Sequence, residues 1–452
     1  MKIGRKTMVS LLVLDTLAVG LIFNVVRLLY DLHGLILLPL VAPAGLVIVS
    51  LYLIDGYKPQ TDMLNLEYAS QHAIALLSAM LATLLVTFVV IPGGYSLQQS
   101  RVVVGISFLA LLPVTLTYRR FSSTLQFRKR RNRCIIFLGD RASALAFKEE
   151  CAVAGMTQPV IHASPVSEPP GAERPPTGTI PVTQVLAQIA SGQLAVEAMV
   201  LRESNSDLTP AISQQLVDLY FAGVPTYTLE LFHQIYWRKI PLYRLNQTWL
   251  FQEGFRVARE PVFERIKRII DILLASVGLV LATPVLLAAS LAIWLEDRGP
   301  VFFKQTRIGK NRIPFSVYKF RSMRQNVTGV PYAQKIDTRI TKVGRFLRAS
   351  RFDELPQILN VIKGEMSLIG PRAEWDRLVA DYEKQIPCYH FRHLVRPGIT
   401  GWAQVNYPYG ASIEDTLRKL EYDLYYIRHF SFGLDASIVL KTIHVMLFGK
   451  GR

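Results

Sequence analysis

The segment RASRFDELPQILNVIKGEMSLIGPR, residues 348–372, decides the fold of the last third of the chain. Pro356 has no amide hydrogen, so it is best accommodated in the first turn of a helix. The segment therefore predicts a helix that begins close to Pro356 and continues through residues 358–362. Two adjacent carboxylates, Asp353 and Glu354, then lie at the positive end of the helix dipole.

Cationic side chains flank this acidic pair in the sequence. The segment VYKFRSM, residues 317–323, is predicted to be extended and to carry two of them at alternate positions. These two are Lys319 and Arg321, and Arg348, Arg351 and Arg372 lie near the pair in the sequence. The helix dipole and these charges favour ionised carboxylates. An ionised aspartate is a nucleophile, a neighbouring glutamate can bind Mg²⁺, and Arg and Lys bind phosphates.

The same residues also fit a purely structural interpretation. Ser350 and Asp353 have the spacing of a helix-capping box, so the acidic pair could cap a helix within a network of ion pairs. The residue types alone do not separate this interpretation from the catalytic one.

Four motifs in this part of the chain resemble the bacterial sugar-transferase family, the monotopic polyprenyl-phosphate hexose-1-phosphate transferases. In order along the chain they are RFDELPQ, KGEMSLIGPR, VRPGITGWAQVN and KLEYDLYYIRH. The similarity extends back through VFFKQTRIGKNRIPFSVYKFRSM and covers residues 263–452. NYPYGAS, residues 406–412, looks most like the exopolysaccharide branch associated with PEP-CTERM systems.

The resemblance implies a phosphoglycosyl transferase that starts exopolysaccharide or O-antigen assembly. Asp353 would attack the β-phosphate of a UDP-hexose and expel UMP, and undecaprenyl phosphate would then take the phosphosugar from the carboxylate. Glu354 would bind Mg²⁺. The implied or candidate phosphate-binding residues are Lys319, Arg321, Arg348, Arg372 and Arg396.

Two departures from the family pattern bear on the site. The family's Pro-Arg-Pro appears here as Pro371-Arg372-Ala373, so a proline that would stiffen the loop is missing. Tyr407-Pro408-Tyr409 stands where many members carry an arginine, which leaves the identity of the hexose open.

A long apolar stretch, Ile272–Leu295, precedes these motifs. Its 24 residues carry no charge and are enough to span a bilayer. Both flanks are basic and thus prefer the cytoplasmic side, and Thr283-Pro284 at the midpoint breaks or kinks a helix. We therefore expect a re-entrant hairpin over residues 264–296 that enters one leaflet and returns. A fifth span with a tolerated kink is the alternative.

The first quarter of the chain predicts a four-helix transmembrane domain rather than a signal peptide. Its apolar segments are residues 8–29, 34–54, 74–91 and 102–117. Lys and Arg precede the first segment and follow the fourth, and the loops 30–33 and 92–100 have none. The positive-inside rule places both ends, and with them the catalytic domain, on the cytoplasmic side of a bacterial inner membrane. Asp15 is expected to pair within the bundle, a ligand path being the alternative.

The middle of the chain predicts a Rossmann-like α/β module with a parallel sheet. Strands are expected at residues 134–138, 198–201 and 225–229, helices at 142–154 and 210–221, and an exposed loop at 157–181. The first turn reads GDRASA, which lacks two of the three glycines of a dinucleotide site, so no bound dinucleotide is expected. A spacer or dimerisation module is the preferred interpretation.

Composition agrees with an α/β membrane protein. Of the 452 residues, half are hydrophobic and 19% are charged, which excludes a disordered protein. The net charge of +17 fits anionic lipid and phosphate substrates, whereas no nucleic-acid partner is expected because no stacking motif accompanies the basic residues. The three cysteines form no disulfide framework, as is typical of a reduced compartment.

The whole pattern predicts three domains. They are a four-helix transmembrane domain at residues 1–120, the α/β module at 121–255 and a mostly helical catalytic domain at 256–452. A homodimer is an open possibility. The alternative function is that of a non-catalytic membrane scaffold or sensor in a polysaccharide-export complex.

Overall fold

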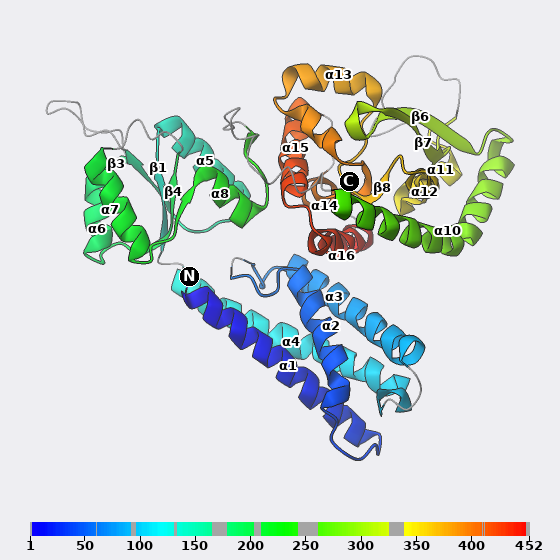
Figure 1. The fold of residues 1–452 in the computed structure, drawn as a ribbon, viewed down its shortest axis with the longest axis horizontal. Coiled ribbons are helices and arrows are strands. Elements are labelled where there is room, and N and C mark those ends of the chain that lie inside the picture. Colours follow the sequence, from blue (N-terminus) through cyan, green and yellow to red (C-terminus); the bar gives the residue numbers. More distant parts are fainter. Residues whose placement is uncertain are drawn as a thin grey trace. The chain divides into compact units, whose positions relative to one another are not determined.

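The computed structural model describes residues 2–59, 61–91, 96–130, 133–164, 179–202, 209–242, 261–324, 339–408, 410 and 412–448. The chain forms two compact units, Met1–Arg238 and Lys239–Arg452 (Figure 1). The loop expected at residues 92–100, the basic run after the last N-terminal helix and the segment 406–412 lie partly outside the described residues.

The first unit begins with apolar helices. They are α1 (Lys2–Leu29), α2 (Val41–Leu53), α3 (Leu66–Leu85) and α4 (Arg101–Arg130). By length and composition, the spans Lys6–Leu29, Leu66–Val90 and Arg101–Gln126 could cross a membrane. The second segment is shorter than expected, because its helical part starts at Leu38 rather than Gly34, whose φ of +92° is incompatible with a right-handed helix.

A buried ion pair joins the first and last of these helices. Asp15 of α1 and Arg119 of α4 are both fully buried and bind each other. The hydroxyl of Tyr57 donates a hydrogen bond of 2.5 Å to Asp15, and Tyr118 donates a second. The expectation that Asp15 pairs within the bundle is therefore confirmed, in line with the high cost of an unpaired charge among apolar helices.

The α/β module contains one parallel sheet in the order β3-β2-β1-β4-β5. The strands are β1 (Cys134–Leu138), β2 (Val160–Ser164), β3 (Thr179–Pro181), β4 (Val196–Leu201) and β5 (Thr226–Thr228). Helices α6 (Val182–Ala190) and α7 (Pro210–Phe221) pack on one apolar core, and α5 (Arg141–Val153) and α8 (Leu229–Phe232) on the other. The parallel sheet predicted from the alternating pattern is confirmed.

The prediction of a single exposed loop at residues 157–181 is wrong at both ends of that range. Its start forms β2 and its end forms β3, while residues 165–178 lie outside the described part. Both strands are short, and polar residues interrupt them, His162 and Ser164 in β2 and Thr179 in β3, so they lack the apolar run that identified β1.

The second unit is mostly helical, as predicted. Its elements are α10 (Pro261–Asp297), β6 (Phe302–Ile308), β7 (Pro314–Phe320), α11 (Lys342–Ser350), α12 (Ile358–Lys363), β8 (Ser367–Ile369), α13 (Asp376–Gln385), β9 (Gly398–Thr400), α14 (Trp402–Asn406), α15 (Ile413–Arg428) and α16 (Phe432–Phe448). Strands β6 and β7 form an antiparallel hairpin, and β8 pairs with β9 in parallel.

Helix α10 contains the predicted breaking point, but it remains one helix of 37 residues. Figure 1 shows that the helix changes direction along its length. The hydroxyl of Thr283 donates to the carbonyl of Leu279 at 2.8 Å, a bond that often accompanies helix bending. The helix is therefore not broken at Thr283-Pro284, which leaves the kink as the form of the prediction that agrees with a continuous helix.

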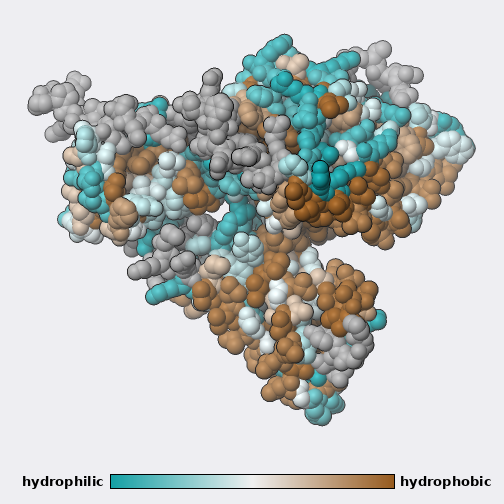
Figure 2. Space-filling model, in the orientation of Figure 1, coloured by the Kyte–Doolittle hydropathy of each residue, from teal (hydrophilic) through white to brown (hydrophobic). Residues whose placement is uncertain are grey.

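Both arms of α10 are held by the same unit. In the first arm, Arg268 donates to the carbonyl of Ile362 at 2.7 Å, and Asp271 accepts from the amide of Leu368 at 3.2 Å. In the second arm, the carboxylate of Glu296 accepts from the amide of Lys342 at 2.8 Å. The apolar side chains of the middle stay exposed, and Figure 2 shows a hydrophobic surface along this helix.

Candidate active site

The acidic pair lies at the start of a helix, as the proline predicts. Residues Phe352–Gln357 form a 3₁₀ helix that continues directly into α12. Arg351, with a φ of +61°, separates this turn from α11. The capping box expected in the structural interpretation is not formed, because the hydroxyl of Ser350 instead donates to the carbonyl of Phe346 at 2.9 Å.

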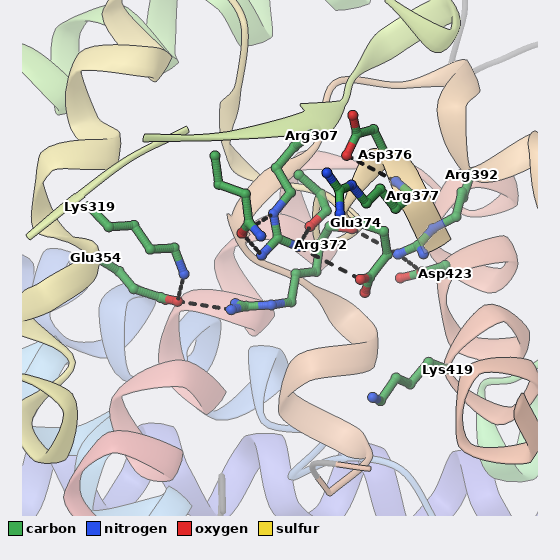
Figure 3. A network of polar contacts seen from close by, with 12 residues as sticks. Arg307, Lys319, Glu354, Arg372, Glu374, Asp376, Arg377, Arg392, Lys419 and Asp423 are labelled. Atoms are coloured by element: carbon green, nitrogen blue, oxygen red, sulfur yellow. Dashed lines mark hydrogen bonds and ion pairs between the residues drawn. The ribbon is translucent and has the colours of Figure 1, made fainter. Parts of the chain in front are cut away.

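Glu354 is held between two cations that come from different parts of the unit (Figure 3). Its Oε1 lies 2.8 Å from Nζ of Lys319 on β7 and 2.9 Å from a guanidinium nitrogen of Arg372, which follows β8. Burial raises the pKa of Glu354. The charges of Arg372 and Lys319 outweigh this effect and hold the pKa well below its usual range. Glu354 is therefore ionised at neutral pH, as predicted.

Asn360 explains how α12 and β7 are aligned. Its side chain accepts from the amide of Tyr318 at 3.1 Å and donates to the carbonyl of Ser316 at 2.7 Å. These bonds fix the register of β7 against the helix that carries Glu354. Lys319, the next residue along β7, is thereby placed opposite the carboxylate.

Asp353 has a different environment from its neighbour. Among the described residues its carboxylate makes no hydrogen bond or ion pair. Burial and the charge of Glu354 raise the pKa of Asp353, while Lys319, Arg348 and Arg351 oppose the rise. The nearby cations thus favour the ionised form of Asp353, as predicted, but burial and the charge of Glu354 outweigh them, so the net shift of its pKa is upward.

Arg348 on α11 acts electrostatically on Asp353 and has spare donor capacity. Its charge lowers the pKa of Asp353. One of its guanidinium nitrogens is buried and makes no hydrogen bond within the described part of the chain. A buried donor without a partner is costly, and an anionic ligand would satisfy it.

Two of the predicted phosphate-binding arginines are not assembled with this pair. Arg321 binds Asp297 at the end of α10, with one nitrogen–oxygen distance of 2.8 Å. Arg396 binds Glu264 at 2.8 Å and the carbonyl of Gly364 at 3.1 Å. Sequence proximity grouped both with the site, but each neutralises a carboxylate of α10 instead.

Several residues around the site were missed by the sequence analysis. They are Arg307, Asn360, Arg392 and Asp423. The available signal was a polar side chain inside an apolar run, as for Asn360 within residues 358–362. Such a residue in a buried helix needs a specific hydrogen-bonding partner.

Comparisons with known proteins show the family to which this part of the chain is related. Residues 262–449 match the model of the family described as bacterial sugar transferase. Over 262 residues, the chain is 41% identical to a protein of Aeromonas hydrophila named UDP-N-acetylgalactosamine-undecaprenyl-phosphate N-acetylgalactosaminephosphotransferase, covering 58% of this chain and 61% of that one.

Two further relatives match shorter stretches of the chain. A protein of Escherichia coli (strain K12) named UDP-glucose:undecaprenyl-phosphate glucose-1-phosphate transferase is 46% identical over 184 residues, which are 39% of each chain. A protein of Rhizobium leguminosarum bv. phaseoli named exopolysaccharide production protein PSS is 43% identical over 195 residues, which are 41% of this chain and 98% of that one. The chain therefore matches only 61% of the Aeromonas protein and 39% of the Escherichia coli protein, but nearly all of the Rhizobium protein. On this evidence the chain belongs to the bacterial sugar transferase family.

Proposed function

We propose that the protein is a phosphoglycosyl transferase that moves a hexose-1-phosphate from a UDP-sugar to undecaprenyl phosphate and releases UMP. One observation carries the proposal. Asp353 has no partner among the described residues, whereas the adjacent Glu354 is bound by Lys319 and Arg372. The substrate classes come from the names of the relatives, two of which are undecaprenyl-phosphate sugar phosphotransferases.

The reaction has two displacements at one phosphorus atom. A carboxylate oxygen of Asp353 forms a bond to the β-phosphorus of the donor, and the bond from that phosphorus to the UMP oxygen breaks. An oxygen of undecaprenyl phosphate then bonds to the same phosphorus, and the carboxylate of Asp353 leaves. Lys319, Arg348 and Arg372 stabilise the phosphate charges.

The residues present fit a role for Mg²⁺. Lys319 and Arg372 both donate hydrogen bonds to Oε1 of Glu354, and within the described ranges Oε2 accepts none. Those ranges contain no cluster of three or more His, Cys, Asp or Glu side chains suited to a metal. Mg²⁺ commonly needs only one or two carboxylates together with substrate phosphates. Glu354 would hold the ion, which would neutralise charge on the donor diphosphate.

The environment of α10 supports a re-entrant insertion with the site on the cytoplasmic side. The contacts of Asp271 and Glu296 attach both arms to the same unit, although the middle is apolar and exposed. A straight span would place these arms on opposite sides of the bilayer. The basic flanks of the helix favour the cytoplasmic face for both.

This topology is tested by cysteine labelling in whole cells. Arg265→Cys and Pro300→Cys, each with Cys388 replaced by Ser, are expected to react only after the inner membrane is permeabilised. His33→Cys, in a loop expected outside, is the control that reacts without permeabilisation. Labelling of one arm from outside the cell would refute the re-entrant arrangement.

The reaction is tested with the purified full-length chain, Mg²⁺ and undecaprenyl phosphate. UDP-glucose and UDP-N-acetylgalactosamine serve as donors, and UMP release is measured. Asp353→Asn is expected to lower the rate by at least about a thousandfold, as for loss of a covalent nucleophile. Asp381→Asn, at an exposed position of α13, is the matched control. Unchanged UMP release by Asp353→Asn would eliminate the covalent mechanism.

A further inference from the structure

A second buried ion pair lies behind the candidate active site. Arg392, in the 3₁₀ helix Tyr389–Leu394, and Asp423, on α15, are 3.0 Å apart, and their side chains are only 6% and 2% exposed. Complete burial raises the pKa of Asp423 to about 6, while the charge of Arg392 opposes the rise. At neutral pH the pair is therefore charged, although burying two charges is expensive and seldom adds net stability.

The guanidinium of Arg392 does more than neutralise Asp423. It donates to the hydroxyl of Tyr389 at 2.6 Å. It also donates to the backbone carbonyl of Arg372 at 2.9 Å, and Figure 3 shows both arginines. Arg372 is the residue whose side chain binds Glu354. A series of polar contacts, which passes through the backbone of Arg372, thus leads from Asp423 to Glu354.

The next residue of the loop is held in a similar way. Arg307 on β6 donates to the carbonyl of Ala373 at 2.9 Å. Residue 373 is where the family pattern places the second proline of Pro-Arg-Pro, and alanine leaves that backbone freer to rotate. Two guanidinium groups therefore restrain the same two peptide units that a proline would otherwise stiffen.

We propose that Arg392, oriented by Asp423, is a positioning residue that fixes the backbone of Arg372 so that its guanidinium is presented to the donor phosphates. The inference rests on the proposed function. It gives a role to a charged pair that is costly to bury. Misplacing the guanidinium of Arg372 is expected to weaken the affinity for the donor about tenfold.

The test is a double-mutant cycle on donor affinity in the full-length chain. All variants carry Asp353→Asn, so that UDP-glucose and UDP-N-acetylgalactosamine bind without turnover, and Kd is measured by titration calorimetry. Arg392→Lys keeps the charge but cannot contact Asp423, Tyr389 and the carbonyl of Arg372 in the same fork geometry. It is expected to weaken donor binding about tenfold when Arg372 is present.

The second side of the cycle separates positioning from general stabilisation. In an Arg372→Gln background, Arg392→Lys is expected to change Kd by less than about twofold, because the group that it positions is gone. Equal weakening in both backgrounds, or none in either, would overturn the inference. Arg312→Lys, in an exposed ion pair of the same unit, is the matched control and is expected to leave Kd unchanged.

Two further measurements keep the outcome interpretable. If Arg392→Lys does not fold, Tyr389→Phe removes only the hydroxyl that Arg392 contacts and is expected to weaken donor binding in the same direction by a smaller factor. UMP release by the chain with Asp353 intact tests the proposed function separately. Release of UMP together with an additive cycle would reject the positioning role and leave the transferase proposal standing.

Discussion

At the residue level, two adjacent carboxylates are differentiated by their partners. Glu354 binds two cations and has a lowered pKa, whereas Asp353 makes no hydrogen bond or ion pair within the described part of the chain and has a raised pKa. A carboxylate oxygen without such a partner keeps its lone pairs available for attack. The contrast supports the division of roles proposed above, with Glu354 as the Mg²⁺ ligand and Asp353 as the nucleophile.

The pH dependence of the reaction is expected to depend on Arg348. Its charge opposes the rise in the pKa of Asp353, so Arg348→Gln raises that pKa further. Because the nucleophile must be ionised, the acid limb of the kcat/KM profile is expected to move to higher pH in this variant. Relative to the unsubstituted chain, the variant is expected to lose several-fold more activity on the acid limb than at neutral pH. The measurement is UMP release across the acid range.

Arg345→Gln provides the matched control for that experiment, because Arg345 is exposed on the same helix, α11. It is expected to leave the pH profile unchanged. A uniform loss of activity for Arg348→Gln, with no displacement of the acid limb, would show that Arg348 binds phosphate without tuning Asp353.

At the level of elements, the site depends on how α12 is attached to β7. Asn360→Leu leaves the amide of Tyr318 and the carbonyl of Ser316 without their partner. Each buried group left unsatisfied costs about 1–3 kcal/mol, so we expect a loss of about 2–4 kcal/mol in the free energy of unfolding. Denaturant titration measures this loss, and kcat is expected to fall because Lys319 loses its alignment with Glu354.

Gln385→Leu is the control for Asn360→Leu, because it also replaces an amide side chain by an apolar one. Gln385 is exposed at the end of α13. It is expected to leave both the stability and kcat unchanged. If Asn360→Leu lowers stability but leaves kcat intact, the alignment of β7 is not needed for the reaction.

The same elements show which parts of the fold were predictable from the sequence. Pro356 predicts the start of α12 because its ring restricts where a helix can begin, and β1 is recognisable from an uninterrupted apolar run. Strands β2 and β3 are held by neighbouring strands rather than by their own residue pattern. The partners of Arg321 and Arg396 were equally unpredictable, because Asp297 and Glu264 reach them only through tertiary packing.

At the level of the whole molecule, the two compact units divide after Arg238. The domain boundary that the sequence predicts, at residue 255, lies outside the described residues. Arg238 binds Asp55 within the first unit. Ile240 and Leu242 are 0% and 3% exposed in the core of the second unit, and the amide of Ile240 donates to the carbonyl of Glu421 at 3.0 Å.

The second unit therefore includes apolar residues that lie upstream of the family match at residue 262. Ile240→Ala in the full-length chain creates a cavity in that core and is expected to lower its free energy of unfolding by about 2–5 kcal/mol. Hydrogen exchange followed by mass spectrometry measures the change in stability separately in each unit. We expect faster exchange in α15 but not in the strands of the α/β module. Ile313→Ala, at a site that is 63% exposed, is the matched control. Equal acceleration in both units would mean that the chain unfolds as a single cooperative body, and that the boundary at Arg238 has no thermodynamic meaning.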